Sequence, residues 1–239
     1  MAENLYKRAY ESLRGQIERG EYKAGDRLPP ENELAAAMGI SRATLRHALD
    51  QLEGDGVLNR VRGSGSYVTK PKLMHESTSI IAGYRREAEK RNRVLRTEVI
   101  DLSVQPAGKA GEKLSLPSNA RVTRLVRRRW VEGFNDGRPV VYTTVHVPYA
   151  FFPDMCEQDF TDASLYDLLE SRMLKVCHAS RVLEVTMPEQ KIAAYLGLSP
   201  FEPAIYVDSI GFDARGRRIE YAQSYYPADS SRFLIEIDR

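Results

Sequence analysis

The sequence predicts an α+β protein of two domains, an N-terminal winged helix-turn-helix and a C-terminal antiparallel α+β domain. A length of 239 residues exceeds that of one average domain. Residues 5–69 carry three short amphipathic helical patterns and a glycine-tipped hairpin pattern, whereas strand-like runs joined by turns dominate the rest. Because Lys70-Pro71-Lys72 is typical of a linker, we expect domains at 1–70 and 79–239, with residues 71–78 between them.

Composition and charge exclude several classes of protein. The chain has 35 Lys and Arg against 33 Asp and Glu, a formal charge of +2, which argues against a histone-like protein and a charged disordered chain. Its two cysteines, Cys156 and Cys177, form no C-x-x-C pair, so neither a disulfide scaffold nor a structural zinc site is indicated. We find no apolar run of membrane-spanning length and no export signal, and we expect a soluble, cytoplasmic protein without metal or cofactor.

Three helices are predicted at the start of the chain. Apolar residues recur every fourth position over 5–17, and Gly20 ends this first helix. Pro29-Pro30 opens the second helix, and Gly39 ends it as a C-terminal cap. Ser41 then caps a third helix. The apolar stripe of that helix is Leu45, Ala48, Leu49 and Leu52. Because the turn before it is so short, the last two helices must cross steeply, which predicts a helix-turn-helix.

The third helix begins with side chains that suit a DNA major groove. Arg42 and Arg46 are four residues apart and share one face, opposite the apolar stripe. An arginine fork can donate two hydrogen bonds to guanine, and this part of a helix-turn-helix meets the base edges. Ser41 and Thr44 could donate to a phosphate or a base, and His47 could reach a phosphate. The alternative is that both arginines merely solvate an exposed helix face.

A β-wing is expected after the third helix. Two β-rich runs between residues 57 and 69 flank a tip that contains two glycines. Arg60 and Arg62 lie beside this tip, and Gly63 and Gly65 permit close approach of the backbone to a minor groove. The third helix and the wing predict double-stranded DNA as a partner. A homodimer would match a palindromic operator, since one such unit reads only a half-site.

The second domain is expected to mix strands and helices. A helix is predicted over 80–88, and two more follow Ser164 and Pro188. Asn135-Asp136-Gly137 is a strong hairpin signal. Strand patterns occupy 95–104, 121–131, 139–147, 182–186, 204–212, 219–226 and 233–237.

One predicted strand carries a candidate anion site. Arg127 and Arg129 flank Arg128, so the first two point to one face and the third to the other. Two inward guanidinium groups are costly to bury unless they meet an anion such as a phosphate or a carboxylate. The alternative is that one pairs with a nearby acid and the other lies at the solvent edge of the sheet.

Three further side chains could complete a pocket for a small anionic effector. Ser164, at a helix N-terminus, could add its hydroxyl and free N–H groups to the anion site. The alternative is that it only caps its helix. Glu220 and Tyr226 are six residues apart on a predicted strand and therefore share a face. They could hydrogen-bond sugar hydroxyls or an amine, so a sugar phosphate, a phosphonate or a carboxylate is the expected ligand.

Several runs of the N-terminal domain resemble the winged helix of the GntR family of bacterial transcription regulators. The runs are Gly25-Asp26-Arg27-Leu28-Pro29-Pro30-Glu31-Asn32-Glu33-Leu34-Ala35, Ile40-Ser41-Arg42-Ala43-Thr44-Leu45-Arg46-His47-Ala48-Leu49, Gly56-Val57-Leu58 and Gly63-Ser64-Gly65-Ser66-Tyr67-Val68. By this resemblance, Ser41, Arg42, Thr44 and Arg46 correspond to DNA-contacting positions and Gly65 to a contact of the wing tip.

Residues 79–237 resemble the UTRA domain of the HutC-type branch of that family, which implies a chorismate-lyase-like fold that binds a small effector. The motifs include Leu125-Val126-Arg127-Arg128-Arg129-Trp130, Arg138-Pro139-Val140, Ser164-Leu165-Tyr166-Asp167-Leu168-Leu169 and Ile219-Glu220-Tyr221-Ala222-Gln223-Ser224-Tyr225-Tyr226. By resemblance to members that bind amino-sugar phosphates, five residues match effector-contacting positions: Arg127, Arg129, Ser164, Glu220 and Tyr226.

The chain departs from these patterns at three places. Asn32 stands where many family members carry arginine, which implies a different operator preference. Thr143 stands where sugar-phosphate binders often carry glutamate, and the run from Tyr226 to Phe233 replaces a tyrosine-arginine-glycine-aspartate run. The resemblance therefore implies an anion site that is better preserved than the part of the pocket that selects the ligand.

Taken together, the sequence favours an effector-responsive transcription regulator, most often a repressor, that binds a palindromic operator as a dimer. The alternative is a lyase-like small-molecule enzyme fused to a DNA-binding module. His146 and His178 have no nucleophile motif near them, and the sequence carries no metal or nucleotide signature. We therefore assign no catalytic residue.

Overall fold

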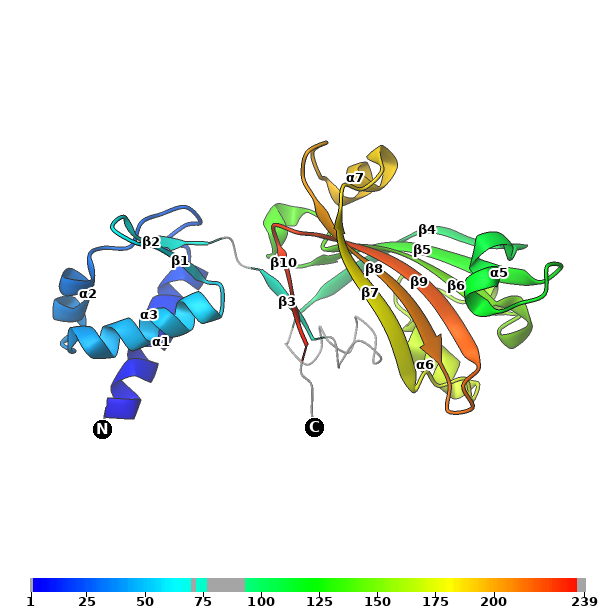
Figure 1. Cartoon of the computed structure of the whole chain (residues 1–239), viewed down its shortest axis with the longest axis horizontal. Coiled ribbons are helices and arrows are strands. Elements are labelled where there is room, and N and C mark those ends of the chain that lie inside the picture. The colour runs from blue at the N-terminus through cyan, green and yellow to red at the C-terminus, as the bar shows by residue number, and fades with distance from the viewer. Residues whose placement is uncertain (1, 70–71, 77–92, 236–239) are drawn as a thin grey trace. The chain divides into compact units, whose positions relative to one another are not determined.

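The computed structural model describes residues 2–69, 72–76 and 93–235 (Figure 1). The chain divides into two compact units, Met1–Lys72 and Leu73–Arg239. The helix predicted over 80–88 lies outside the described residues. None of the helices in the described ranges combines the length and apolar composition that a bilayer crossing requires.

The N-terminal unit is the predicted winged helix-turn-helix. Its elements are α1 (Ala2–Glu18), α2 (Glu31–Met38), α3 (Arg42–Gly54), β1 (Leu58–Val61) and β2 (Gly65–Val68). Gly39 ends α2 with a φ of 64°, and the backbone N–H of Thr44 donates to Ser41 Oγ at 3.1 Å, as expected of the two caps. The three helices close over a core that includes Leu13, Leu34, Leu45, Leu49 and Leu52.

The second unit is built on one six-stranded sheet in the order β4-β5-β6-β9-β8-β7, and every neighbouring pair is antiparallel. The strands are β4 (Leu95–Pro106), β5 (Arg121–Val131), β6 (Val141–Pro148), β7 (His178–Thr186), β8 (Ala204–Phe212) and β9 (Arg218–Pro227). Between β5 and β6, Asn135 and Asp136 have φ values of 56° and 52°, which fits the predicted hairpin turn.

Helices cover both faces of this sheet. On one face α6 (Leu165–Ser171) packs through Leu165 and Leu169 against Leu125 and Val145. The other face is covered by α7 (Gln190–Leu196), whose Leu196 packs in a cluster with Val126, and by α5 (Gly108–Leu114). The sequence predicted α6 and α7 but not α5. Short 3-10 turns occupy Asn135–Gly137, Tyr149–Phe151 and Met155–Glu157.

A pair of short strands differs from the sequence prediction. β3 (Leu73–Glu76) lies inside the segment 71–78 that we expected to be a linker, and it pairs in parallel with β10 (Ser231–Leu234). Leu73 is buried, and the His75 ring packs between Tyr226 and Phe233 at centroid distances of 4.7 and 4.8 Å. Four residues are too few for periodicity to reveal a strand whose partner lies about 160 residues away.

Candidate functional sites

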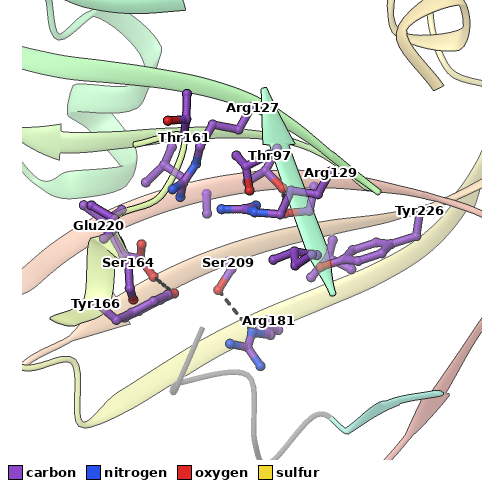
Figure 2. A pocket seen from close by; sticks show the side chains of 18 of the residues that line it. Thr97, Arg127, Arg129, Thr161, Ser164, Tyr166, Arg181, Ser209, Glu220 and Tyr226 are labelled. Atoms are coloured by element: carbon purple, nitrogen blue, oxygen red, sulfur yellow. Dashed lines mark hydrogen bonds between the residues drawn. The ribbon is translucent and has the colours of Figure 1, made fainter. Parts of the chain in front are cut away.

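The α6 face of the sheet and the segment before α6 enclose a cavity of about 310 Å³, a size that suits a small molecule (Figure 2). All five residues that the sequence proposed for effector binding line it: Arg127, Arg129, Ser164, Glu220 and Tyr226. They come from two strands and from the N-terminal cap of α6. The structure thus brings together residues that are up to 99 positions apart in the sequence.

The alternation of side chains along β5 determines which of its arginines face the cavity. Arg127 is opposite Thr143 of β6, which in turn is opposite Ser224 of β9, so a row of polar side chains crosses the cavity floor. Thr143 Oγ1 and Ser224 Oγ are hydrogen-bonded at 3.2 Å. Arg128, one residue on, points to the other face and pairs with Glu98 at 3.0 Å. The predicted division of these arginines between the two faces is confirmed.

Arg127 is buried with its positive charge incompletely matched. Its side chain is 5% exposed, its Nε has no hydrogen-bond partner, and its guanidinium lies 5.5 Å from the centroid of the Phe160 ring. Burial, and next the charge of Arg129, hold the pKa of Arg127 well below its usual value, although Tyr166 and Glu220 oppose this shift. Arg129 is 9% exposed, so neither arginine lies at a solvent edge. The alternative that placed one of the two at such an edge is therefore wrong.

Glu220 is the buried acid of the cavity. Its Oε1 accepts a hydrogen bond from the Tyr166 hydroxyl, and its Oε2 is buried without a hydrogen-bond partner. Burial raises the pKa of Glu220, whereas the Tyr166 hydrogen bond and the charges of Arg181 and Arg127 counteract the rise. Gly211 on β8 makes room for this side chain, because a Cβ there would lie 2.8 Å from Glu220 Cγ.

Several cavity residues were missed by sequence reasoning. Arg181 of β7 lines the cavity, and its Nε donates to Ser209 Oγ of β8 at 3.3 Å. We expected this strand to begin at residue 182, so the alternation that pairs Arg181 with Leu183 went unused. Thr143 was noted only as a departure from a family pattern. Ser164 Oγ accepts from the backbone N–H of Asp167 at 3.4 Å, which makes it the predicted helix cap as well as a lining residue.

The exposed face of α3 is the candidate DNA-reading surface. Arg42, Arg46 and His47 are exposed, while Leu45 and Leu49 are buried. Arg46 donates to Glu31 Oε2 at 3.2 Å. The His47 ring stacks on Tyr6, with 4.3 Å between centroids and 13° between planes. Arg42 and Arg46 therefore share the exposed side of the helix, as the sequence predicted.

Arg60 is held against α2 and α3 instead of reaching out from the wing. It donates to Glu31 Oε1 at 2.8 Å and also pairs with Asp50 of α3. Burial acts to raise the pKa of Glu31, but the hydrogen bonds and charges of Arg46 and Arg60 outweigh it and lower the pKa. Glu31 thus links α3 to β1, the first strand of the wing.

The conformation of the wing tip depends on two glycines, of which Gly63 is exposed and Gly65 is half-buried. Arg62 is exposed, and Gly63 and Gly65 have φ values of 77° and 131°, in the region that favours glycine. A Cβ on Gly65 would lie 2.7 Å from Arg27 Nε. Any other residue at 65 would displace the Arg27 side chain.

Comparison with known proteins matches both units to described families. Residues 5–68 match "Bacterial regulatory proteins, gntR family", and residues 90–232 match the "UTRA domain". The mannosyl-D-glycerate transport/metabolism system repressor MngR of Escherichia coli (strain K12) is 27% identical over 236 residues, which cover 98% of this chain and 96% of MngR.

Two further proteins align over almost the whole chain. The HTH-type transcriptional repressor NagR of Bacillus subtilis (strain 168) is 26% identical over 237 residues, which cover 98% of this chain and 95% of NagR. The crystal structure of PhnF from Mycobacterium smegmatis superposes with a TM-score of 0.81 at 24% identity, over 96% of this chain and 99% of that chain. This structural likeness supports the fold.

Proposed function

Since the chain belongs to the GntR family of bacterial transcription regulators and carries a UTRA domain, we propose that it is a repressor that binds a palindromic operator as a homodimer and leaves it when a small anionic metabolite fills the cavity. Family membership makes the chain a regulator and not an enzyme, so the lyase-like alternative is dropped. The direction of control follows the two full-length relatives, which are both named as repressors.

The buried Arg127 is the observation that carries the effector proposal. A guanidinium that is 5% exposed, with an Nε that lacks a hydrogen-bond partner and a second arginine beside it, favours an anionic ligand. The fork of Arg127 and that of Arg129 suit a phosphate, a phosphonate or a carboxylate. The free Oε2 of Glu220 can accept from a hydroxyl or an amine of the same ligand.

Operator recognition depends on the placement of a few charges. Residues 1–73 contain 12 Lys and Arg against 10 Asp and Glu, so bulk attraction to phosphates is weak. Arg42 and Arg46 are the proposed base readers, with Ser41, Thr44 and His47 as supporting contacts. Arg62, Gly63 and Gly65 are the proposed wing contacts. Arg60 joins them when DNA phosphates compete with its carboxylate partners.

The β7 edge is the proposed dimer contact. This strand ends the sheet, so its outer backbone groups have no neighbouring strand in the sheet of the described chain. Val182, Val185 and Met187 on and beside it are 55%, 74% and 60% exposed. A second copy of the same edge would cover these apolar side chains and supply the two-fold axis that a palindromic site demands.

The same strand offers a route from effector to DNA. β7 carries Arg181 and Leu183 into the cavity, and its exposed Val182 and Val185 lie on opposite faces of the edge that the proposed partner would cover. An effector that binds more tightly when β7 is shifted would change the spacing of the two winged helices. To weaken operator binding it must favour the non-DNA conformation, and couplings of this kind are typically about 1–3 kcal/mol.

Selection of duplexes from a random pool by the purified chain tests the operator proposal. We expect an inverted repeat whose half-sites lie about one helical turn apart, and a gel shift of that duplex reversed by a phosphorylated metabolite. Selection of a single, non-repeated site would refute the dimeric mode. Val185→Lys should give monomers in sedimentation and weaken the shift, while Glu184→Lys, an exposed change on the same strand, separates loss of the apolar contact from addition of charge.

A further inference from the structure

A third arginine faces the cavity from the far edge of the sheet. Arg127 and Arg129 lie on β5, whereas Arg181 lies on β7, and the strands β6, β9 and β8 separate the two. In Figure 2, Arg181 and Ser209 lie across the cavity from the two β5 arginines. At about 4.8 Å per strand, the axes of β5 and β7 are about 19 Å apart along the sheet. Curvature brings the side chains closer, but the two cationic groups remain on opposite walls.

Arg181 is held on its own wall by a neighbour. Its Nε donates to Ser209 Oγ at 3.3 Å, and this bond orients the guanidinium from β8. One tetrahedral anion bound to Arg127 and Arg129 would therefore leave Arg181 for a different part of the ligand. Arg127, Arg129 and Arg181 also differ from the other polar lining groups, which are mostly hydroxyls.

Among the described residues that line the cavity, arginines outnumber carboxylates. Arg93, Arg127, Arg129 and Arg181 line it together with Asp162 and Glu220. A phosphate dianion held by Arg127 and Arg129 would place its charge on their wall, across the cavity from Arg181. The wall that carries Arg181 can therefore take a second anionic group.

Hydroxyl groups and one free acceptor line the space between the two cationic walls. Thr143, Ser224 and Ser209 contribute hydroxyls, and Glu220 Oε2 is buried without a hydrogen-bond partner. These groups can donate to and accept from the hydroxyls of a short polar chain. About 310 Å³ of space limits the ligand to a small metabolite.

We propose that the effector is a hydroxylated metabolite with an anionic group at each end, and that Arg181 recognises the second anion while Arg127 and Arg129 hold the first. The chemical class is a phosphorylated or phosphonylated hydroxy acid, with phosphate at one end and carboxylate at the other. This inference rests on the proposed effector function of the cavity and narrows its ligand. Arg181 is then the residue that distinguishes such a compound from a sugar phosphate, which has only one anionic group.

Two matched pairs of probes test this proposal with the full chain. Glycerol 3-phosphate and 3-phosphoglycerate differ by a terminal carboxylate, as do glucose 6-phosphate and 6-phosphogluconate. Titration at constant ionic strength should show at least one carboxylate-bearing probe binding tenfold or more tightly than its partner. In Arg181→Gln this advantage should fall below threefold, while the binding of the partner without the carboxylate stays the same.

The control variants distinguish loss of the Arg181 contact from a general loss of positive charge and from unfolding. Arg128→Gln, which removes the same charge from the opposite face of the sheet, should keep the full advantage. Arg181→Lys should restore part of it, which a merely unfolded Arg181→Gln would not allow. Arg127→Gln should weaken both members of each pair.

The outcomes distinguish failure of the Arg181 contact from failure of the anionic effector itself. Equal binding within both pairs, or an advantage that survives in Arg181→Gln, overturns the role of Arg181. An effector with one anionic group then remains in place if binding still depends on Arg127. If no probe and no inorganic phosphate binds in a manner that Arg127→Gln weakens, the anionic effector itself is refuted, and this inference with it.

Discussion

Strand β5 presents arginines on both of its faces, and the two faces solve the problem of a buried charge differently. On the α5 and α7 side, Arg124 pairs with Asp101 at 2.8 Å and Arg128 pairs with Glu98 at 3.0 Å. On the cavity side, Arg127 is 5% exposed with an Nε that no hydrogen bond satisfies. One residue type on one strand is therefore part of the scaffold on one face and a candidate ligand contact on the other.

The two faces differ in how far solvent and acidic neighbours compensate the charge of each guanidinium. Arg124 and Arg128 keep partial contact with solvent, and the Arg128 guanidinium also lies 4.9 Å from the centroid of the Trp130 ring. Such pairs contribute only about 0–1 kcal/mol each, so their loss is tolerable. Burying a charge without full pairing costs several kcal/mol of stability. A protein keeps such a residue when a bound ligand compensates its charge.

The largest expected effect is on effector binding. Arg127→Ala should abolish the rise in melting temperature that the effector causes, a loss of at least about 100-fold in affinity, because the buried charge-assisted hydrogen bonds disappear. Arg128→Ala on the opposite face should change the affinity by less than about threefold. Differential scanning fluorimetry with the tightest-binding probe measures both variants, and a full shift retained in Arg127→Ala would refute the anion role.

An exposed arginine in the other unit extends the comparison to DNA. Arg46→Ala should weaken binding to the selected operator by about 1–3 kcal/mol, the value of one bidentate contact to guanine, and leave the effector-induced shift unchanged. Arg19→Ala is the control, because Arg19 is an exposed arginine that pairs with Glu21 at 2.8 Å beyond the end of α1. Gel shifts on the operator and on an unrelated duplex report the specific part, and an unchanged operator affinity in Arg46→Ala would refute the recognition-helix assignment.

The comparison explains which parts of the site the sequence could predict. Alternation along a single strand was enough to separate Arg127 and Arg129 from Arg128, and caps at Ser41 and Gly39 were enough to locate the helix-turn-helix. These features are local, because each depends on neighbours within four residues.

The features that the sequence could not predict depend on contacts between distant segments. The pairing of Arg60 with Glu31 and Asp50 spans 29 and 10 residues, and no pattern in the chain indicates it. Arg181 reaches the cavity only because β7 is added to the sheet beyond β8 and β9. β3 was not predicted for the same reason, because it forms only by pairing with the distant strand β10.

The stability of the ligand-free protein should respond with opposite signs on the two faces. Arg127→Met removes a buried guanidinium, and burial lowers the pKa of this group because it disfavours the charged form. The free energy of unfolding should therefore rise by about 1–2 kcal/mol. Arg128→Met removes a paired, partly exposed charge and should lower it by less than about 1 kcal/mol. Urea denaturation without ligand measures both. A loss of stability in Arg127→Met would mean that Glu220 already compensates Arg127 in the empty cavity.

The smallest effect concerns His146, which is opposite Arg124 in the β5–β6 pair. Burial, and then the charge of Arg124, lower the pKa of His146 to about 4, below the unfolded value of about 6.5. The folded protein therefore binds this proton less readily than the unfolded chain, and the stability that neutral His146 contributes is present above pH 6.5 and is lost as the pH falls toward 4.

Arg124→Gln tests this coupling across the paired face. Without the guanidinium the folded pKa of His146 should rise, but burial, the larger cause, remains, so the acid-induced loss should shrink by less than about 1.4 kcal/mol, the equivalent of one pKa unit. Because Arg124→Gln also frees Asp101, the same change must be made in a His146→Gln background, where the effect between pH 6.5 and 5 should vanish. If it persists there, the effect does not come from His146, and the coupling between Arg124 and His146 is refuted.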